Sequence, residues 1–229
     1  MQINSIETPH DSILLIDKPY GWTSFDIVKK IKAIIRNKTK NKVKVGHAGT
    51  LDPLATGLLI ICTGSHTKKA EALVGLDKVY TGQIRIGATT PSFDLETEPE
   101  NIKDISKISE LDIHNATNIF LGEIKQYPSI FSAKKIDGKK MYEHARKGND
   151  IEIKASTVNI HEFKITTINL PYLDFKIRCS KGTYIRSIAN DYGQALNVGG
   201  HLTALRRTEI REFSIDKAIN INDFELLFQ

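Results

Sequence analysis

An acid in a glycine-rich turn constrains the fold of this chain more than any other segment. Residues 46–59 read Gly-His-Ala-Gly-Thr-Leu-Asp-Pro-Leu-Ala-Thr-Gly-Leu-Leu. The three glycines admit backbone angles that are closed to other residues, and Pro53 fixes the turn directly after Asp52. Apolar neighbours make Asp52 a poor candidate for a solvated surface charge. Two interpretations follow: Asp52 caps a helix that comes after it, or it is a reactive carboxylate.

Composition narrows the class of protein. A chain of 229 residues with 40% hydrophobic content can bury a substantial core as one domain. We expect no membrane span, because no apolar run reaches about 18 residues, and no signal peptide, because the N-terminus lacks the basic-then-apolar pattern. Cys62 and Cys179 stand far apart without metal-ligand spacing, which predicts reduced thiols, a cytoplasmic location and no metal site.

The charge is unevenly distributed. Eight basic residues and no acid lie between Lys29 and Lys44, whereas the acids gather between Asp94 and Asp112. A local basic run suits a polyanionic partner, because neutralised phosphates release their counterions. The alternative is a solvated, lysine-rich loop that follows a helix.

Periodicity indicates both strands and helices. Strand patterns, which are β-branched runs or strict alternation, occur at residues 12–17, 57–62, 80–86, 151–168 and 172–179. Helical spacing or capping residues occur after Thr23 or Ser24, at 68–74, from near Ser106 or Ser109, and at 184–196, where Gly199 and Gly200 end the helix. This mixture predicts an α/β (α+β) fold with a mixed, largely antiparallel sheet flanked by helices.

Residues 126–150 predict a surface insertion. The segment is polar and basic, and Pro128, Gly138 and Gly148 interrupt it. Aromatic residues interleave with lysines, which suits contact with an RNA backbone combined with stacking on bases. The residues concerned are Tyr127, Phe131, Lys134, Lys135, Lys139, Lys140 and Tyr142. The alternative is an ordinary hairpin-and-helix insertion.

Several separated blocks, in order along the chain, resemble the bacterial tRNA pseudouridine-55 synthases, the TruB family. These blocks are residues 14–24, 46–59, 77–80, 126–146, 179–186 and 201–207. The resemblance implies a pseudouridine-synthase fold, a single catalytic domain over residues 1–229, and a thumb at about 126–150 that closes over the T-arm of tRNA. It implies a monomer that modifies the T-loop uridine at tRNA position 55.

The resemblance also assigns a catalytic group. Asp52 matches the nucleophile, Tyr80 matches a tyrosine that stacks on the flipped base, and Arg186 matches the active-site arginine. A carboxylate among apolar residues needs a nearby cation to stay ionised, and arginine keeps its charge. Taken alone, Tyr80 in an alternating strand is a core residue, and Arg186 is a surface residue at the start of a helix.

Other matches imply substrate binding. The residues are Lys18, His47, Lys134, Lys139, Tyr184 and Leu205. His47 matches the histidine that fills the space left by the flipped nucleotide, and we expect Lys18 to brace the Asp52 loop rather than perform chemistry. No cofactor is expected, because the isomerisation transfers no electrons or phosphoryl groups.

The chain also departs from the family pattern. It ends soon after Arg206 and Arg207, so we expect no RNA-binding PUA domain, and RNA contacts from residues 29–44, 126–150 and this arginine pair. The sequence after Gly87 contains Pro91, which is unusual for that loop in the family. Two alternatives remain open: a tRNA-folding or RNA-binding module, and a related synthase that acts on another RNA.

Overall fold

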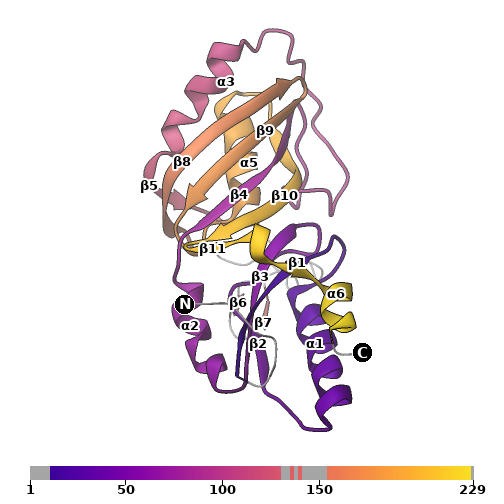
Figure 1. Ribbon diagram of the computed structural model, residues 1–229. Coiled ribbons are helices and arrows are strands. Elements are labelled where there is room, and N and C mark those ends of the chain that lie inside the picture. Colours follow the sequence, from indigo (N-terminus) through magenta and orange to yellow (C-terminus); the bar gives the residue numbers. More distant parts are fainter. Residues whose placement is uncertain (1–10, 130–134, 137–138, 141–153, 228–229) are drawn as a thin grey trace. The chain divides into compact units, whose positions relative to one another are not determined.

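The computed structural model describes residues 11–129, 135–136, 139–140 and 154–227 (Figure 1). These residues form two compact units. The first contains the described residues up to Tyr80 and from Leu205 onward, and the second is Thr81–Ala204. Two strands, β4 (Lys78–Ile86) and β10 (Gly200–Ile210), begin in one unit and end in the other.

The sheet of the first unit is mixed. Its strands follow the order β12 (Ile219–Asn220), β1 (Ile13–Lys18), β3 (Thr56–Thr63) and β10, with β2 (Val45–His47) paired to β3 and β11 (Phe213–Ser214) paired to β10. β1 and β3 are antiparallel, whereas β3 runs parallel to β10 with Arg207 opposite Gly57. This parallel pair brings the C-terminal part of the chain beside the strand that follows the Asp52 loop.

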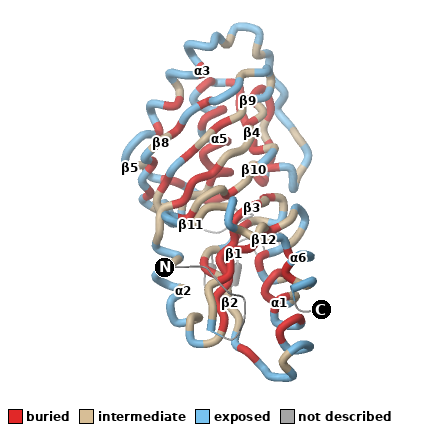
Figure 2. The backbone as a smooth tube through the Cα atoms, in the orientation of Figure 1, coloured by how far each residue is buried: buried red, intermediate tan, exposed pale blue. Residues whose placement is uncertain are grey.

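Helix α1 (Ser24–Thr39) covers one face of this sheet (Figure 2). It begins with a capping box, in which the Thr23 hydroxyl accepts from the Asp26 amide and the Asp26 carboxylate accepts from the Thr23 amide. Its apolar stripe packs against β1, β3 and helix α6 (Ile221–Leu226). The residues of this stripe are Ile27, Val28, Ile31, Ile34 and Ile35.

The alternative interpretation of residues 29–44 as a lysine-rich loop is wrong for its first part. α1 continues to Thr39 and ends at Lys40, which adopts a left-handed conformation (φ 58°). The basic residues from Lys29 to Lys38 therefore lie on a helix. Lysine and arginine have long, unbranched side chains that are compatible with a helix and reach into solvent. The apolar stripe therefore determines that this segment is helical.

The second unit contains a sheet in the order β10, β4, β9 (Tyr172–Cys179), β8 (Ser156–Asn169) and β5 (Gly122–Gln126). β8 is antiparallel to both β9 and β5. Helix α5 (Ile185–Ala195) packs on this sheet through Tyr192, whose ring lies 5.5 Å from that of Phe163 and whose hydroxyl donates to the Ile113 carbonyl (2.7 Å). Ile113 lies on helix α3 (Glu110–Ala116), which Ser109 caps as predicted.

The shorter elements complete the two units. A 3-10 helix, η1 (Gly64–Lys69), leads into α2 (Ala70–Val74), so the helix predicted at 68–74 begins with a tighter turn. Two further 3-10 helices are η2 (Asn118–Phe120) and η3 (Ile215–Lys217). The backbone of β6 (Lys135–Ile136) pairs antiparallel with that of β7 (Lys139–Lys140).

The predicted α/β class with a mixed, largely antiparallel sheet is confirmed. The sequence analysis missed β5, β10 and α6, and it placed the end of α5 too late. α5 ends at Ala195, and Gly200 instead packs against Gly193, where a Cβ atom on Gly193 would lie 2.0 Å from the Gly200 nitrogen. No helix in the described ranges is long and apolar enough to cross a membrane.

Most of the predicted insertion at 126–150 lies outside the described residues. Phe131, Lys134 and Tyr142 belong to that part, and so does the side chain of Lys139. The thumb, and the single catalytic domain over residues 1–229, stay predictions.

Gly57 should not tolerate a side chain. It has φ +106°, and a Cβ atom there would lie 2.3 Å from the Arg207 carbonyl oxygen. We expect Gly57→Ala to lower the free energy of unfolding by about 3 kcal/mol, because left-handed strain and a backbone clash add. Denaturant unfolding measures this. Gly46→Ala is the control, because nothing lies within 4 Å of its Cβ position. Equal stability of the two variants would contradict the β3–β10 packing.

Candidate active site

Asp52 lies in the loop that joins β2 to β3. Its side chain is half-buried, and the loop continues through a turn at Pro53 and Leu54 directly into β3. Because a strand follows Asp52, the interpretation of this residue as a helix cap is wrong. The loop instead presents the carboxylate between two strands of the first unit.

Every peptide carbonyl from Gly49 to Pro53 accepts a hydrogen bond. The Arg207 guanidinium donates to Gly49 (3.1 Å) and Thr50 (3.4 Å), the Ser24 hydroxyl to Leu51 (3.1 Å), the Ala55 amide to Asp52 (3.1 Å), and the Gly21 amide to Pro53 (2.9 Å). The Ser24 hydroxyl also accepts from the Leu51 amide at 2.9 Å. A backbone held at five successive carbonyls is pre-organised, so the Asp52 side chain leaves it from a defined position.

Arg207 is a buried residue of β10 that contacts this loop, and it is not available to contact RNA. The residue is 1% exposed, and its Nε donates to the Leu58 carbonyl at 2.7 Å. The expectation that Arg207 binds RNA is therefore wrong, because its guanidinium is buried and donates to three backbone carbonyls of the Asp52 loop and β3. Its neighbour Arg206 makes two hydrogen bonds to the Asp17 carboxylate, at 3.0 and 2.7 Å.

Lys18 lies directly under the loop. It is fully buried, and its Nζ donates to the carbonyls of Pro19 (2.9 Å), Trp22 (2.6 Å) and Pro53 (3.4 Å). Burial lowers the pKa of Lys18 to about 8; the Asp52 carboxylate opposes this shift and Arg207 adds to it. The expectation that Lys18 braces the Asp52 loop is confirmed, while its role in substrate binding stays a prediction.

The other predicted residues of the first unit occupy separate strands. His47 is half-buried at the end of β2, and burial, followed by the Arg207 charge, lowers its pKa so that the imidazole is neutral at neutral pH. Tyr80 is buried in β4, and Leu205 is half-buried in β10, where its carbonyl accepts from the Thr56 hydroxyl at 3.4 Å.

Arg186 is buried in the second unit and paired with an acid. It lies in the first turn of α5, and its guanidinium is 3.3 Å from the Asp94 carboxylate, with both side chains under a tenth exposed. The interpretation of Arg186 as a surface residue is wrong. Because Asp52 and Arg186 belong to different units, their pairing stays a prediction.

The sequence analysis missed Asp94. It counted this residue with the acids of the polar segment up to Asp112, whereas Asp94 is buried and its carboxylate also accepts from the Glu96 amide at 3.0 Å. The hydroxyls of Thr90 and Ser92 donate to its backbone carbonyl, at 2.8 and 3.1 Å. The uncharged, hydroxyl-rich residues before Asp94 were the one sequence feature that could have indicated its burial.

The base of the 126–150 segment is attached to α5. The Gln126 side chain donates to the Tyr184 carbonyl (2.9 Å) and accepts from the Tyr184 amide (2.7 Å), and the Ser187 hydroxyl donates to the Tyr127 carbonyl (2.8 Å). Tyr184 and Arg186, both predicted site residues, therefore lie beside the start of the predicted thumb.

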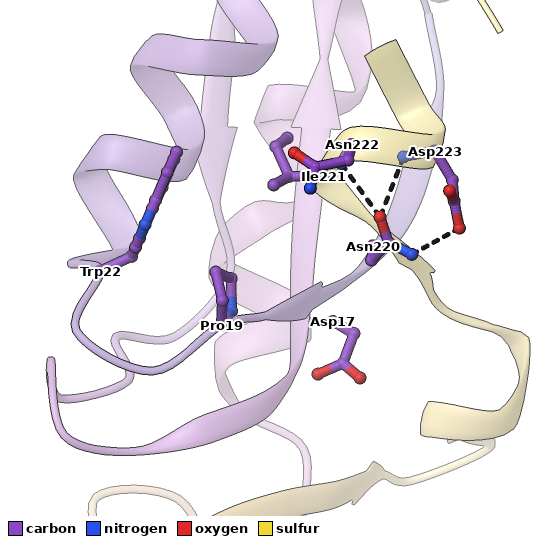
Figure 3. Close-up of a pocket in the computed structure, with 7 residues that line it drawn as sticks. All are labelled: Asp17, Pro19, Trp22, Asn220, Ile221, Asn222 and Asp223. Carbon is purple, nitrogen blue, oxygen red and sulfur yellow. Dashed lines mark hydrogen bonds between the residues drawn. The ribbon is translucent and has the colours of Figure 1, made fainter. Parts of the chain in front are cut away.

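A pocket of about 380 Å³ opens elsewhere in the first unit (Figure 3). Asp17, Pro19 and Trp22 line it from the β1 side, and Asn220 to Asp223 line it from the start of α6. The Asn220 side chain is occupied in capping α6, since it accepts from the amides of Asn222 and Asp223. The pocket contains none of the predicted catalytic residues. Across the described ranges, no cluster of three or more His, Cys, Asp or Glu side chains could hold a metal ion.

Comparisons with known proteins define the class. Residues 36–185 match the N-terminal domain of the TruB family pseudouridylate synthases, and residues 186–229 match the C-terminal domain of tRNA pseudouridylate synthase B. The class is thus that of the pseudouridine synthases, which are isomerases. The chain belongs to the TruB family.

Relatives support this over nearly the whole length. The tRNA pseudouridine synthase B of Flavobacterium johnsoniae is 56% identical over 215 residues, which are 93% of this chain and 94% of the relative. That of Chloroherpeton thalassium is 51% identical over 216 residues, which are 94% of this chain and 89% of the relative.

Solved structures share the fold. The structure of an H/ACA RNP bound to a substrate RNA containing 2'-deoxyuridine has a TM-score of 0.68 at 26% identity. That similarity covers 93% of this chain and 52% of the other, so this chain spans about half the length of that protein. A Cbf5-Nop10-Gar1 complex gives 0.70 at 26% identity, over 93% and 53% of the two chains.

Arg207 should be needed for turnover as well as stability. We expect Arg207→Met to lower the free energy of unfolding by about 3 kcal/mol, because buried carbonyls lose their hydrogen-bond donor. We also expect kcat to fall by about a hundredfold, because the Asp52 loop is no longer held in place. Denaturant unfolding and single-turnover kinetics measure these changes. Arg206→Met is the control, since the ion pair of Arg206 with Asp17 is partly exposed and such a pair contributes about 1 kcal/mol or less. An unchanged kcat in folded Arg207→Met would contradict the role of the loop contacts.

Lys18 predicts a pH dependence of stability. Its pKa is about 8 in the folded protein and near 10.5 in the unfolded chain, so between these values the unfolded chain binds more protons. The contribution of Lys18 to the free energy of unfolding should therefore rise from pH 8 to about 10.5. The measurement is the difference in unfolding free energy between wild type and Lys18→Met at several pH values. A difference that stays constant or falls with pH would refute the shift.

Proposed function

We propose that this protein isomerises the T-loop uridine at tRNA position 55 to pseudouridine, with Asp52 as the nucleophile. The observation that carries the proposal is the hydrogen-bonded loop around Asp52, in a chain of the TruB family. Relatives that are named tRNA pseudouridine synthase B cover most of the chain, which supports tRNA as the substrate.

The reaction requires a nucleophile, which a single carboxylate can supply. The bond between uracil N1 and ribose C1' breaks, the base turns, and C5 bonds to the same C1'. C5 loses a proton and N1 gains one, so atoms and electrons balance within the substrate. The base must leave its stack to reach a nucleophile in a loop, which requires extrusion of the uridine.

The surroundings of Asp52 suit a nucleophile. The Asp52 carboxylate opposes the lowering of the Lys18 pKa, so a positive charge lies within electrostatic range of this loop. Arg207 adds a second buried positive charge at the same loop. In this proposal the loop that carries the nucleophile is held by two cationic side chains, those of Lys18 and Arg207.

The remaining site residues complete the proposal. Tyr80 stacks on the extruded uracil, Arg186 supplies a positive charge, and Tyr184 and Leu205 contact the substrate. His47 fills the space left by the uridine, which suits a side chain that is uncharged at neutral pH. Lys134 and Lys139 contact the T-arm backbone. The protein acts as a monomer in the cytoplasm, where its two buried cysteines remain reduced thiols.

The direct test is conversion of a minimal RNA. The purified protein is incubated with a T-arm hairpin that carries the target uridine, and pseudouridine is quantified by mass spectrometry after nuclease digestion. We expect one pseudouridine per hairpin, and none when cytidine replaces the target uridine. Modification of ribosomal RNA, with the hairpin and intact tRNA left unmodified, would favour the related synthase.

Asp52→Asn separates chemistry from binding. The amide keeps the shape of the side chain but loses the nucleophilic charge, so we expect turnover to fall by several orders of magnitude. The protein should keep its fold and much of its affinity for the hairpin, because the hydrogen bonds that hold the loop are accepted by its backbone carbonyls; a thermal melt and a binding titration measure this. Residual turnover within tenfold of wild type would exclude Asp52 as the nucleophile.

A further inference from the structure

Exposed aromatic and basic side chains gather on the outer face of α1 and on the turn before it. We call this set the α1 surface, and it consists of Tyr20, Phe25, Lys29, Lys32 and Arg36. The four helical members are spaced by four, three and four residues, so they share one face of the helix. That face is opposite the buried isoleucine stripe (Figure 2).

The aromatic members are unusually accessible for residues of their size. Tyr20 is 61% exposed and Phe25 is 59% exposed. The Lys29 ammonium lies 4.8 Å from the centre of the Phe25 ring, which places a cation against an exposed aromatic side chain. An exposed aromatic flanked by cations is the arrangement that binds single-stranded nucleic acid.

The basic members are poorly neutralised. Within the described part of the chain, no acid lies within ion-pair distance of Lys32 or Arg36. Lys29 is 3.7 Å from Asp26, whose carboxylate is also used in the capping box. Lys30, on the flank of the same helix, differs because it pairs with Glu225 at 2.6 Å. Lys32 and Arg36 therefore carry unpaired charges on the outer face.

The aromatic end of this surface is attached to the Asp52 loop. The Ser24 hydroxyl bonds to both backbone groups of Leu51, and the Gly21 amide donates to the Pro53 carbonyl. A rise of 1.5 Å per residue puts Phe25 and Arg36 about 16 Å apart along the helix. A strand whose base reaches the Asp52 loop can therefore continue along α1 for several phosphates.

We propose that the α1 surface binds the substrate RNA next to the target uridine. Lys29, Lys32 and Arg36 contact phosphates of the T-arm, and an unpaired base stacks on Phe25 or Tyr20. The argument is charge complementarity together with attachment to the Asp52 loop, and it rests on the proposed function for the identity of the RNA. α1 thereby extends the substrate site beyond the Asp52 loop.

The first test measures the salt dependence of binding. The double variant Lys32→Gln/Arg36→Gln is compared with Lys107→Gln/Lys217→Gln, which removes the same charge from exposed lysines elsewhere. We expect the slope of log Kd against log salt for the T-arm hairpin to fall by about 1.5 in the first variant. The control should keep the wild-type slope, and kcat at saturating hairpin should stay within twofold for both.

The second test addresses stacking. At least one of Phe25→Ala and Tyr20→Ala should weaken hairpin binding by about tenfold, with little change in salt slope, because stacking involves no counterion release. Thermal melts show that the variants fold, as expected for exposed side chains. An unchanged salt slope in Lys32→Gln/Arg36→Gln, or unchanged affinity in both aromatic variants, overturns the proposal.

The two proposals fail separately. Binding is measured without turnover, so a wild-type protein that binds the hairpin through α1 but makes no pseudouridine would refute only the proposed function. A wild-type protein that makes pseudouridine, with α1 variants that bind normally, would refute only the α1 surface.

Discussion

The hydrogen bonds from the buried Arg207 guanidinium to the Asp52 loop are the constraint on which the rest of the first unit depends. Burying a guanidinium removes its hydration and costs free energy. Hydrogen bonds to the carbonyl oxygens of Gly49, Thr50 and Leu58 offset this cost. The parallel pairing of β3 with β10 puts Arg207 opposite Gly57, and the missing side chain of Gly57 permits the close approach. The position of Arg207, which the pairing of β3 with β10 determines, thus determines the geometry of the Asp52 loop.

The electrostatics of the site follow from the same burial. Lys18 and Arg207 bring two positive charges under a loop that carries one carboxylate, and the pKa of Lys18 falls to about 8 as a result of burial. The same environment lowers the pKa of His47 and leaves a neutral ring beside the loop. In the second unit, Arg186 is balanced instead by Asp94. The Asp52 loop is therefore held by two cations that are both buried from solvent.

Helix α1 combines two tasks in one segment. Its isoleucine stripe forms the core of the first unit, its first residue holds Leu51, and its outer face carries unpaired cations. The sequence analysis recognised the stripe and the charge but assigned the charge to a loop. The helix continued because lysine and arginine are good helix formers, so their charge is no signal that a helix has ended.

Local signals in the sequence determined the Asp52 turn, the capping residues Thr23 and Ser109, and the alternating strands, since each depends on residues close in the chain. Only the tertiary structure decided which charged residues are buried. Arg207 and Asp94 look like surface charges in sequence, and β10 carries two adjacent arginines that hide its strand character. Their partners lie 92 to 158 residues away, at Arg186 for Asp94 and at Gly49 for Arg207. Burial of a charge depends on such distant partners, and no local pattern records them.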